Sequence, residues 1–264
     1  MRRKYVIGAL ALTATLAALI LQISSSPQPS FKGKGLSEWV RGYEGNARHA
    51  DVDEAMRQMG TNSLPILLRM VGEAEWSVVA KRKVFNFGQK LHLVKSDQTP
   101  LRFSREAAGE AISALGPDAK DVVPVLVKMY ERGHSDEQVI MRVLASIGPP
   151  ASNALPIILR ATTNKDSGTR ANAIVALRNL KVQPAISVPV LIKALDDDYY
   201  LVVVDALWGL GEAGIEANVA IPAILPLLKS TNNVLPKAAS DALNQIDPEA
   251  AKAAGVWAPW AANK

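Results

Sequence analysis

Few side chains in this sequence have the types and spacing that chemistry requires. The chain of 264 residues contains no cysteine, which excludes disulfides, thiolate metal sites and a cysteine nucleophile. Its three histidines, His49, His92 and His134, do not have the spacing of metal ligands. The sequence also lacks His-Glu-x-x-His, Gly-x-Ser-x-Gly and Walker-type motifs. We therefore expect a protein that is not an enzyme and that uses no cofactor or metal ion.

Two short segments could in principle hold an ion. Asp196, Asp197 and Asp198 offer the oxygen ligands that hard cations prefer. Consecutive residues of a turn cannot all point at one cation, so we expect a solvated helix terminus there. The segment 33–35, Gly-Lys-Gly, is shorter than a phosphate-binding loop and lies in a predicted linker, residues 27–35.

Residues 1–26 have the pattern of a targeting segment. Three basic residues at positions 2–4 precede 19 uncharged residues, from Tyr5 to Ile23, and a Ser/Pro-rich stretch follows. A helix of that length spans about 28 Å, close to the thickness of a bilayer core. Since cleaved signal peptides usually have a shorter apolar stretch, we expect an uncleaved inner-membrane anchor with a cytoplasmic N-terminus. A cleaved signal peptide, which would leave a periplasmic or secreted protein, and a buried helix of a soluble protein are the alternatives.

The positive charge of the chain is concentrated in two places. The formal net charge is +5, which taken alone is compatible with nucleic-acid binding. The leader carries three of these charges and residues 76–105 carry a net +6, which leaves the rest of the chain at −4. Because export would separate the chain from nucleic acid, we do not expect nucleic acid as a partner.

The basic segment 76–105 is predicted to contain an amphipathic helix over about residues 78–94, followed by a loop. One interpretation is a solvated basic face. The other is contact with an anionic partner, such as phospholipid headgroups, a cell-wall polymer or an acidic protein. The candidate residues for that contact are Lys81, Arg82, Lys83, Lys90, Lys95 and Arg102.

Two patterns recur along the chain with a period of 32 or 33 residues. Prolines followed by apolar residues lie at positions 124, 156, 189 and 222, with an earlier copy at Pro65. Between them, four apolar positions recur at i, i+3, i+4 and i+7, which places them on one helix face. A period of this size indicates stacked repeats. The copies of the second pattern begin at Val52, Ala108, Ile140, Ala173, Val203 and Ala239.

Each repeat is therefore expected to be a pair of antiparallel helices of about 10–13 residues. The connectors agree, because glycines at positions 60, 116, 148 and 211 follow the second helices and prevent their continuation. Helices this short are marginal alone, so their stability must come from neighbouring pairs. Small residues in the pattern let those neighbours approach closely.

This arrangement resembles the HEAT repeat, in which Pro-x-Leu begins the first helix and Arg-x-x-Ala-x-x-Ala-Leu-x-x-Leu-Gly forms the second. The resemblance covers about residues 36–247. It implies an all-α, right-handed α-solenoid of about five to six helix pairs. Arg105 and Arg170 match the arginine of the family and Asp196 matches its aspartate, whereas Gln138, Tyr200 and Pro236 replace the arginine in other copies. Residues 31–39 also resemble the start of exported bacterial HEAT-repeat proteins.

The resulting organisation has four parts: an anchor or signal at 1–26, a linker at 27–35, a solenoid at 36–248 with an insert at 76–104, and a tail at 249–264. The ends of a repeat array must be covered. Leu36, Trp39, Val40 and Tyr43 have helical spacing and can cap the first repeat. In the tail, Val256, Trp257 and Trp260 are expected to cover the exposed end of the last repeat.

The surface of the second helices is the predicted partner site. In register, one column of side chains contains Glu110, Arg142, Val175, Asp205 and Asp241, and the adjacent column contains Ser113, Ala145, Arg178, Trp208 and Asn244. Aromatic residues and arginine dominate interface energetics. The candidates for partner contact are therefore Trp208, Arg178, Arg142, Asp205, Asp241 and Glu110. Packing of Trp208 against the turn at 211–221 is the equally open alternative.

The sequence thus favours a non-enzymatic scaffold or adaptor of the bacterial cell envelope, which binds an unidentified protein on its repeat surface. The alternative is an envelope module that binds an anionic lipid or polymer through residues 76–105.

Overall fold

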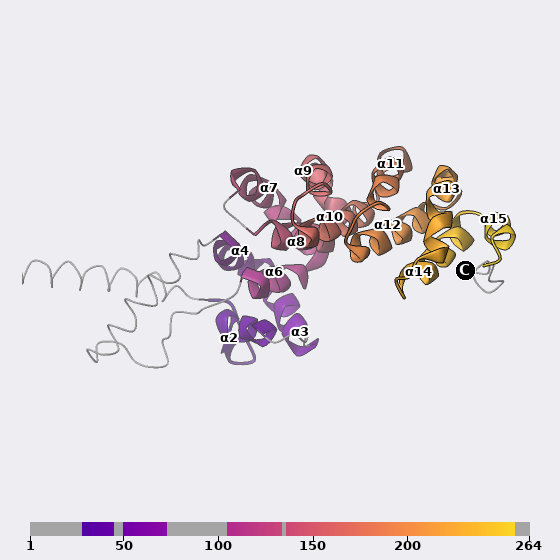
Figure 1. The fold of residues 1–264 in the computed structure, drawn as a ribbon. Helices are drawn as coiled ribbons and strands as arrows, with labels where there is room; N and C mark the ends of the chain where they lie inside the picture. The colour runs from indigo at the N-terminus through magenta and orange to yellow at the C-terminus, as the bar shows by residue number, and fades with distance from the viewer. Residues whose placement is uncertain (1–27, 45–49, 73–104, 134–135, 257–264) are drawn as a thin grey trace, which may run out of the picture. The chain divides into compact units, whose positions relative to one another are not determined.

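The computed structural model describes residues 28–44, 50–72, 105–133 and 136–256 (Figure 1). Apart from one small hairpin, the elements of these residues are helical, so the prediction of an all-α fold is confirmed. The chain divides into two compact units, whose boundary falls between Ala114 and Leu115. The predicted leader, the insert at 76–104 and both tryptophans of the tail lie outside the described residues.

The first unit begins with a hairpin where the sequence predicts a linker. Ser30 pairs with Gly35 and Phe31 with Lys34, in antiparallel register. The two residues between the strands have positive φ, 47° at Lys32 and 75° at Gly33, as a two-residue hairpin turn requires. In chain order the elements of this unit are β1 (Ser30–Phe31), β2 (Lys34–Gly35), α2 (Leu36–Val40), η1 (Arg41–Glu44), α3 (Ala50–Met59), η2 (Gly60–Ser63), α4 (Leu64–Gly72) and α6 (Arg105–Ser113).

The core of the first unit lies where α2, α3 and α4 pack on or around α6. Leu36 and Val40 of α2 are fully buried and Tyr43 is nearly so, which confirms the helix predicted from their spacing. Met56 of α3 and Leu67 of α4 are also fully buried.

The second unit consists of short helices joined by 3-10 turns. Its elements are η4 (Gly116–Val122), α7 (Val123–Arg132), α8 (Glu137–Ile147), η5 (Pro149–Ala154), α9 (Leu155–Ala161), α10 (Ser167–Asn179), α11 (Pro184–Ala194), α12 (Tyr200–Ala213), η6 (Gly214–Ala220), α13 (Ile221–Ile224), η7 (Leu225–Lys229), α14 (Leu235–Ile246) and α15 (Pro248–Ala253).

These helices form two layers. Figure 1 shows α7, α9, α11 and α13 along one side of the unit and α8, α10, α12 and α14 along the other. Within the second layer, α10 packs against both α8 and α12, and α12 packs against α14. We call α8, α10, α12 and α14 the second-helix layer.

The four-position pattern of the sequence forms the core. Every one of its residues in the six copies from Val52 to Ile246 is buried, and the most exposed of them, Met59, is only 6% exposed. Close approach of two helices also involves a glycine outside this pattern. A Cβ atom on Gly209 of α12 would lie 2.9 Å from a methyl group of Leu191 on α11. The side chain of Leu191 is therefore packed directly against the backbone of the neighbouring helix.

Glycine ends two of the second helices in a conformation that other residues rarely adopt. Gly148 has φ 69° and ψ −139°, and Gly214 has φ 61° and ψ −139°. The sequence predicted Gly211 for the second of these turns, but α12 continues through that residue to Ala213, so the turn starts three residues later. The intervening repeat uses Lys181 at φ 54°, 33 residues after Gly148.

One prediction about the first helices is also corrected. Pro124 and Pro156 lie in the first turn of α7 and α9, as expected. In α11, by contrast, the helix begins at Pro184 and includes Pro189 in its interior. Proline in the first turn lacks only an N–H that has no partner in the helix, so Pro184 starts α11 in the way that Pro124 starts α7.

The segment Tyr200–Lys229 is, by length and composition, apolar enough to cross a membrane. In the structure it is divided into α12, η6, α13 and η7, with a positive φ at Gly214. The buried residues of α12 pack between α10 and α14, and this packing explains the apolar character of that helix, whereas Ile215 and Val219 of η6 are exposed.

The backbone at Gly148 leads to the first prediction. Gly148→Ala is expected to lower the free energy of unfolding by about 2 kcal/mol, because the new side chain would favour neither the φ nor the ψ of this residue. Its Cβ would also lie 3.4 Å from the carbonyl oxygen of Asn179. Urea denaturation followed by circular dichroism measures the effect. Gly133→Ala is the control, since Gly133 is left-handed (φ 64°, ψ 18°) with open space around it, and an equal loss in both variants would contradict the argument.

Candidate interaction surface

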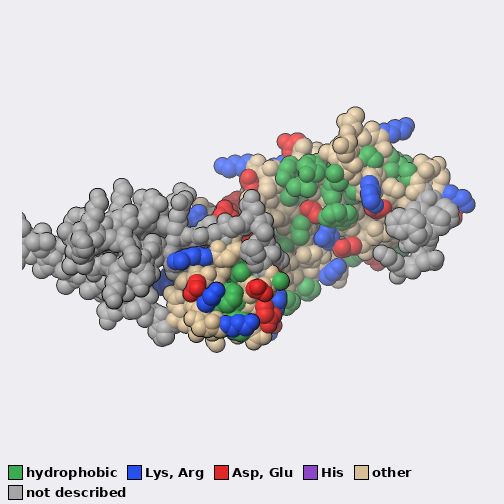
Figure 2. Space-filling model, turned by 90° about the horizontal axis from the view of Figure 1, so that it is seen from below, with side chains coloured by type: hydrophobic (Ala, Val, Ile, Leu, Met, Phe, Trp, Pro, Cys, Tyr) green, Lys and Arg blue, Asp and Glu red, His purple; other side chains and the backbone are tan. Residues whose placement is uncertain are grey.

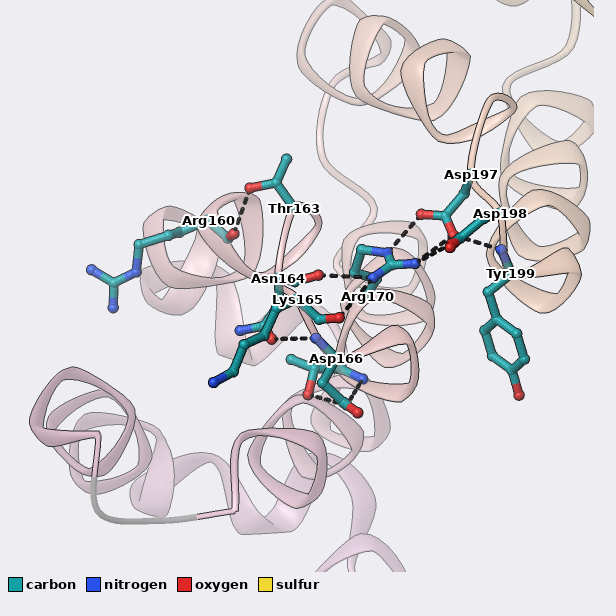
Figure 3. A network of polar contacts seen from close by, with 10 residues as sticks. Arg160, Thr163, Asn164, Lys165, Asp166, Arg170, Asp197, Asp198 and Tyr199 are labelled. Carbon is teal, nitrogen blue, oxygen red and sulfur yellow. Dashed lines mark hydrogen bonds and ion pairs between the residues drawn. The ribbon is translucent and has the colours of Figure 1, made fainter.

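A network of polar contacts fixes the start of α10 relative to α12 (Figure 3). The guanidinium of Arg170 donates from Nε to Oδ2 of Asp197 at 2.7 Å and from Nη2 to Oδ1 of Asp197 at 2.8 Å. Nη2 also donates to Asp198 at 2.7 Å, and Nη1 donates to the carbonyl of Asn164 at 2.9 Å. Arg170 and Asp197 are both nearly buried, with 13% and 12% of their side chains exposed. The arginine therefore joins one helix pair to the next.

This network corrects two expectations about the three consecutive aspartates. The sequence matched Asp196 to the aspartate of the HEAT pattern, whereas the structure pairs Arg170 with Asp197 and Asp198. The expectation of a solvated helix terminus fits Asp198, which is 91% exposed, but is wrong for Asp197. Burial opposes ionisation of Asp197, yet hydrogen bonds from Arg170 and the N–H of Tyr199 outweigh it and hold its pKa below the usual range.

Two asparagine contacts hold α10 beside α8. Asn179 donates from Nδ2 to the carbonyl of Ala145 at 3.0 Å, and Asn172 donates to the carbonyl of Gln138 at 3.2 Å. Both donors lie 34 residues after their acceptors, one residue more than the spacing of the four-position pattern between α8 and α10, so the two contacts share the same offset. The register of the second-helix layer is thus fixed by hydrogen bonds as well as by packing.

On this layer the structure brings together three of the predicted partner residues. The guanidinium carbon of Arg178, on α10, lies 5.6 Å from the centre of the Trp208 ring on α12. Nη1 of Arg178 lies 3.5 Å from Oδ1 of Asp205, one turn before Trp208. Arg178 and Asp205 are largely covered, with 18% and 14% of their side chains exposed, whereas Trp208 is 45% exposed. A cation over the face of an indole is attracted by its quadrupole, which orients the ring.

Two more charged residues border this group. Nε of Arg178 lies 3.6 Å from Oε1 of Glu212, and Lys181 Nζ lies 3.4 Å from the other oxygen of Glu212. We call Arg178, Lys181, Asp205, Trp208 and Glu212 the Trp208 cluster. Sequence reasoning missed Glu212 and Lys181. Their separation of 31 residues is close to one repeat, so a search for opposite charges one repeat apart would have found them.

Asp205 is the member of the Trp208 cluster whose negative charge is poorly compensated. Burial raises its pKa from 3.8 to about 6, and the attraction of Arg178 only partly opposes this shift. The Nε and Nη1 atoms of Arg178 are buried and their distances to the carboxylates exceed that of a hydrogen bond. The cluster is therefore held by charge and stacking rather than by short, directional bonds.

The other predicted partner residues do not join this cluster. Asp241 lies on α14, where it accepts from Lys237 at 2.8 Å. Arg142 is half-buried on α8, and Glu110 lies on α6 of the first unit. The anionic-partner candidates Lys81, Arg82, Lys83, Lys90, Lys95 and Arg102 lie outside the described residues.

Other apolar side chains of the second unit are exposed as well. Leu201, two turns earlier on α12, is 37% exposed, and Ile215 and Val219 of η6 are 65% and 67% exposed. Figure 2 shows apolar side chains gathered, between scattered charges, on the side of the second unit that it presents. Among the described residues, no group of three His, Asp or Glu side chains is arranged to hold a metal ion.

The comparisons with known proteins give structural likenesses and no family. No protein-family model matches the chain, and no curated protein matches it. Similar solved structures include two crystal structures of engineered proteins. The first shares 20% sequence identity at a TM-score of 0.48, over 89% of this chain and 66% of that one. The second shares 21% identity at a TM-score of 0.45, over 84% of this chain and 98% of that one.

The Arg170 network leads to a prediction about stability. Arg170→Met is expected to lower the free energy of unfolding by about 2–3 kcal/mol, because Asp197 would keep a buried charge without its bidentate partner. Urea denaturation at pH 7 measures this loss. Arg57→Met is the matched control on α3, where the ion pair with Glu54 is half-exposed and contributes at most about 0.5 kcal/mol. Equal losses in the two variants would refute the assigned role.

The carboxyl of Asp205 leads to a prediction about pH. Because its folded pKa, about 6, lies above the usual 3.8, the folded state binds the proton more tightly and stability falls as pH rises from 4 to 6. Asp205→Asn removes this dependence, so its stability relative to the native chain should rise by about 1–2 kcal/mol between pH 4 and pH 7, allowing for partial solvent screening.

Thermal and urea unfolding across this pH range tests the prediction, with Asp241→Asn on α14 as the control for the loss of one surface charge. Parallel stability curves for the native chain and Asp205→Asn would show that Asp205 titrates normally.

Proposed function

We propose that the chain is a HEAT-type α-solenoid that binds a protein partner on its second-helix layer. Three features support the solenoid: the 32- or 33-residue period, the positive-φ residues that end successive second helices, and the Arg170 link between neighbouring pairs. The proposed array contains about five to six helix pairs and is right-handed, as in the family it resembles. The proposed mechanism is binding alone: the stacked repeats create an extended surface that buries part of the partner.

The observation that carries the binding role is the half-exposed Trp208. Tryptophan has the largest apolar side chain, and a ring that remains 45% exposed loses water only when something covers it. Arg178 already orients the ring, so little conformational entropy is lost on binding. A rigid aromatic side chain with neighbouring arginine has the composition of an interface hot spot. Leu201 provides further apolar area on the same helix.

The competing explanation for Trp208 is packing against the following turn. In the structure α12 continues as a helix to Ala213, and the identified contact of the ring is with Arg178 on the preceding repeat. The ring is thus oriented from α10, which supports a contact role for its free face.

We further propose that the protein works in the bacterial cell envelope as a non-enzymatic scaffold or adaptor. The apolar segment of the leader supports this location by its length and its basic flank. An uncleaved leader would anchor the chain in the inner membrane with the repeats outside the cytoplasm. The alternative, binding of an anionic polymer or lipid through residues 76–105, is supported by the net charge of +6 in that segment. Binding lost in high salt would favour the alternative.

A substitution tests the contact role of Trp208. Trp208→Ala is expected to weaken capture of the partner about 30-fold, the effect of removing a hot-spot tryptophan of about 2 kcal/mol. Crosslinked capture from the envelope fraction identifies the partner, and titration with that partner measures the affinity. Circular dichroism and urea unfolding must show that the variant is folded.

Ile186→Ala is the matched control, because it also removes an exposed apolar side chain, from α11, which does not belong to the second-helix layer. If a folded Trp208→Ala protein captures its partner as well as the native chain does, Trp208 is not the contact.

A further inference from the structure

The hairpin of the first unit and α2 form a compact cluster of aromatic and basic side chains. The indole N–H of Trp39 donates to the carbonyl of Phe31 at 3.0 Å, and the two rings lie 6.1 Å apart. Lys32 Nζ lies 5.1 Å from the centre of the Phe31 ring, and Lys34 Nζ lies 5.0 Å from that of Trp39. We call Phe31, Lys32, Lys34 and Trp39 the hairpin cluster.

The rest of the unit holds this cluster in place. The N–H of Leu36 donates to the carbonyl of Pro29 at 2.8 Å, which closes the chain around the hairpin. The hydroxyl of Ser37 donates to the side-chain oxygen of Gln28. On α2, which follows the hairpin directly, Leu36 and Val40 are fully buried. The hairpin that carries the two lysines is therefore attached to a packed helix and is not a free chain end.

The position of the cluster in the chain limits where it can be. The apolar stretch of the leader ends at Ile23, and the hairpin begins at Ser30. Only five residue steps separate Ile23 from Gln28, which fixes the distance at no more than about 18 Å even in a fully extended chain. If the leader crosses a membrane, the hairpin cluster must lie close to the bilayer surface.

The chemistry of the cluster suits that surface. Tryptophan and other aromatic rings are enriched at the level of lipid headgroups, and each lysine near an anionic leaflet contributes about 1 kcal/mol of attraction. Lys34 is half-exposed, and its nearest acid, Glu38, is 4.0 Å away and itself half-exposed. Over residues 28–44, Lys32, Lys34 and Arg41 outnumber the acids Glu38 and Glu44 by one. On α3, Glu54 is a further acid whose charge interacts with that of Lys32.

We propose that the hairpin cluster is a lipid-docking surface, through which the first unit rests on the anionic headgroups of the membrane that holds the leader. This inference rests on the proposed membrane anchor. It concerns different residues from the basic segment 76–105 and a different unit from the Trp208 cluster.

Spin labelling of the full chain tests the docking. Because the sequence has no cysteine, a single label can be attached at Ser30→Cys, which is exposed in β1 next to the cluster. Asn62→Cys, exposed in η2 of the same unit, is the matched reference label. The chain is reconstituted in nanodiscs with or without phosphatidylglycerol, and the collision rate of each label with a water-soluble nickel chelate is measured.

Docking predicts that the label at position 30 is several-fold less accessible to nickel in the anionic discs than in neutral ones, while the label at position 62 is unchanged. Lys32→Gln combined with Lys34→Gln should restore accessibility, since each lysine contributes about fivefold to docking. Arg57→Gln with Arg69→Gln, which removes two charges from α3 and α4, should not.

Two results would overturn the inference and they differ from each other. A chain that stays in the discs with its label at position 30 equally accessible in both lipids is anchored but not docked. A chain that is released from the discs has no membrane anchor, so the proposed location fails and the docking surface fails with it.

Discussion

Burial of one face of every second helix against its neighbours is the constraint on which the rest of the structure depends. The helices of the second unit have between four and fourteen residues, lengths that are marginal in water. They persist because small residues allow close contact, as where Gly209 leaves room for Leu191. A side chain at Gly209 would separate α11 from α12 and expose apolar surface on both helices. The packing at this position therefore tolerates little change.

This packing also determines which polar residues can meet. Contacts between successive repeats recur at separations of 27 and 34 residues, as in Arg170 with Asp197 and Asn179 with Ala145. The same separations place Arg178 beside Asp205 and Glu212. Two ion pairs with the same sequence separation have opposite effects on the pKa of the aspartate. Arg170 satisfies Asp197 with short bonds, whereas Asp205 remains poorly compensated and has a raised pKa. Poor compensation beside an exposed tryptophan costs stability without improving the core, which is the pattern expected where function rather than folding selects the residues.

The sequence predicts the fold better than it predicts the site, and the reason is physical. Helix faces follow from a periodicity that many residues share, so the buried pattern from Val52 to Ile246 could be recognised without coordinates. Turn positions depend on single residues. Gly211 and Gly214 are both candidates in the sequence for the end of the helix, and only the backbone geometry shows that α12 continues past Gly211 and ends at Gly214. Polar contacts are still harder to predict from the sequence. Asp196 and Asp197 are neighbours in sequence, and a single residue of register decides which one meets Arg170.

The two proposed surfaces belong to separate compact units, and this separation has a consequence for mechanism. The hairpin cluster is stabilised by α2, α3 and β2 of the first unit, and the Trp208 cluster by α10 and α12 of the second. Among the described residues, the contacts that define the two clusters share no residue. If the proposed function holds, substitutions on the proposed partner surface should leave the proposed membrane contact unchanged, since repeat units depend chiefly on their immediate neighbours. The net charge of +5 is therefore informative only when divided by position. Residues 1–26 and 76–105 carry the excess, whereas the Trp208 cluster has two basic and two acidic residues around one aromatic ring.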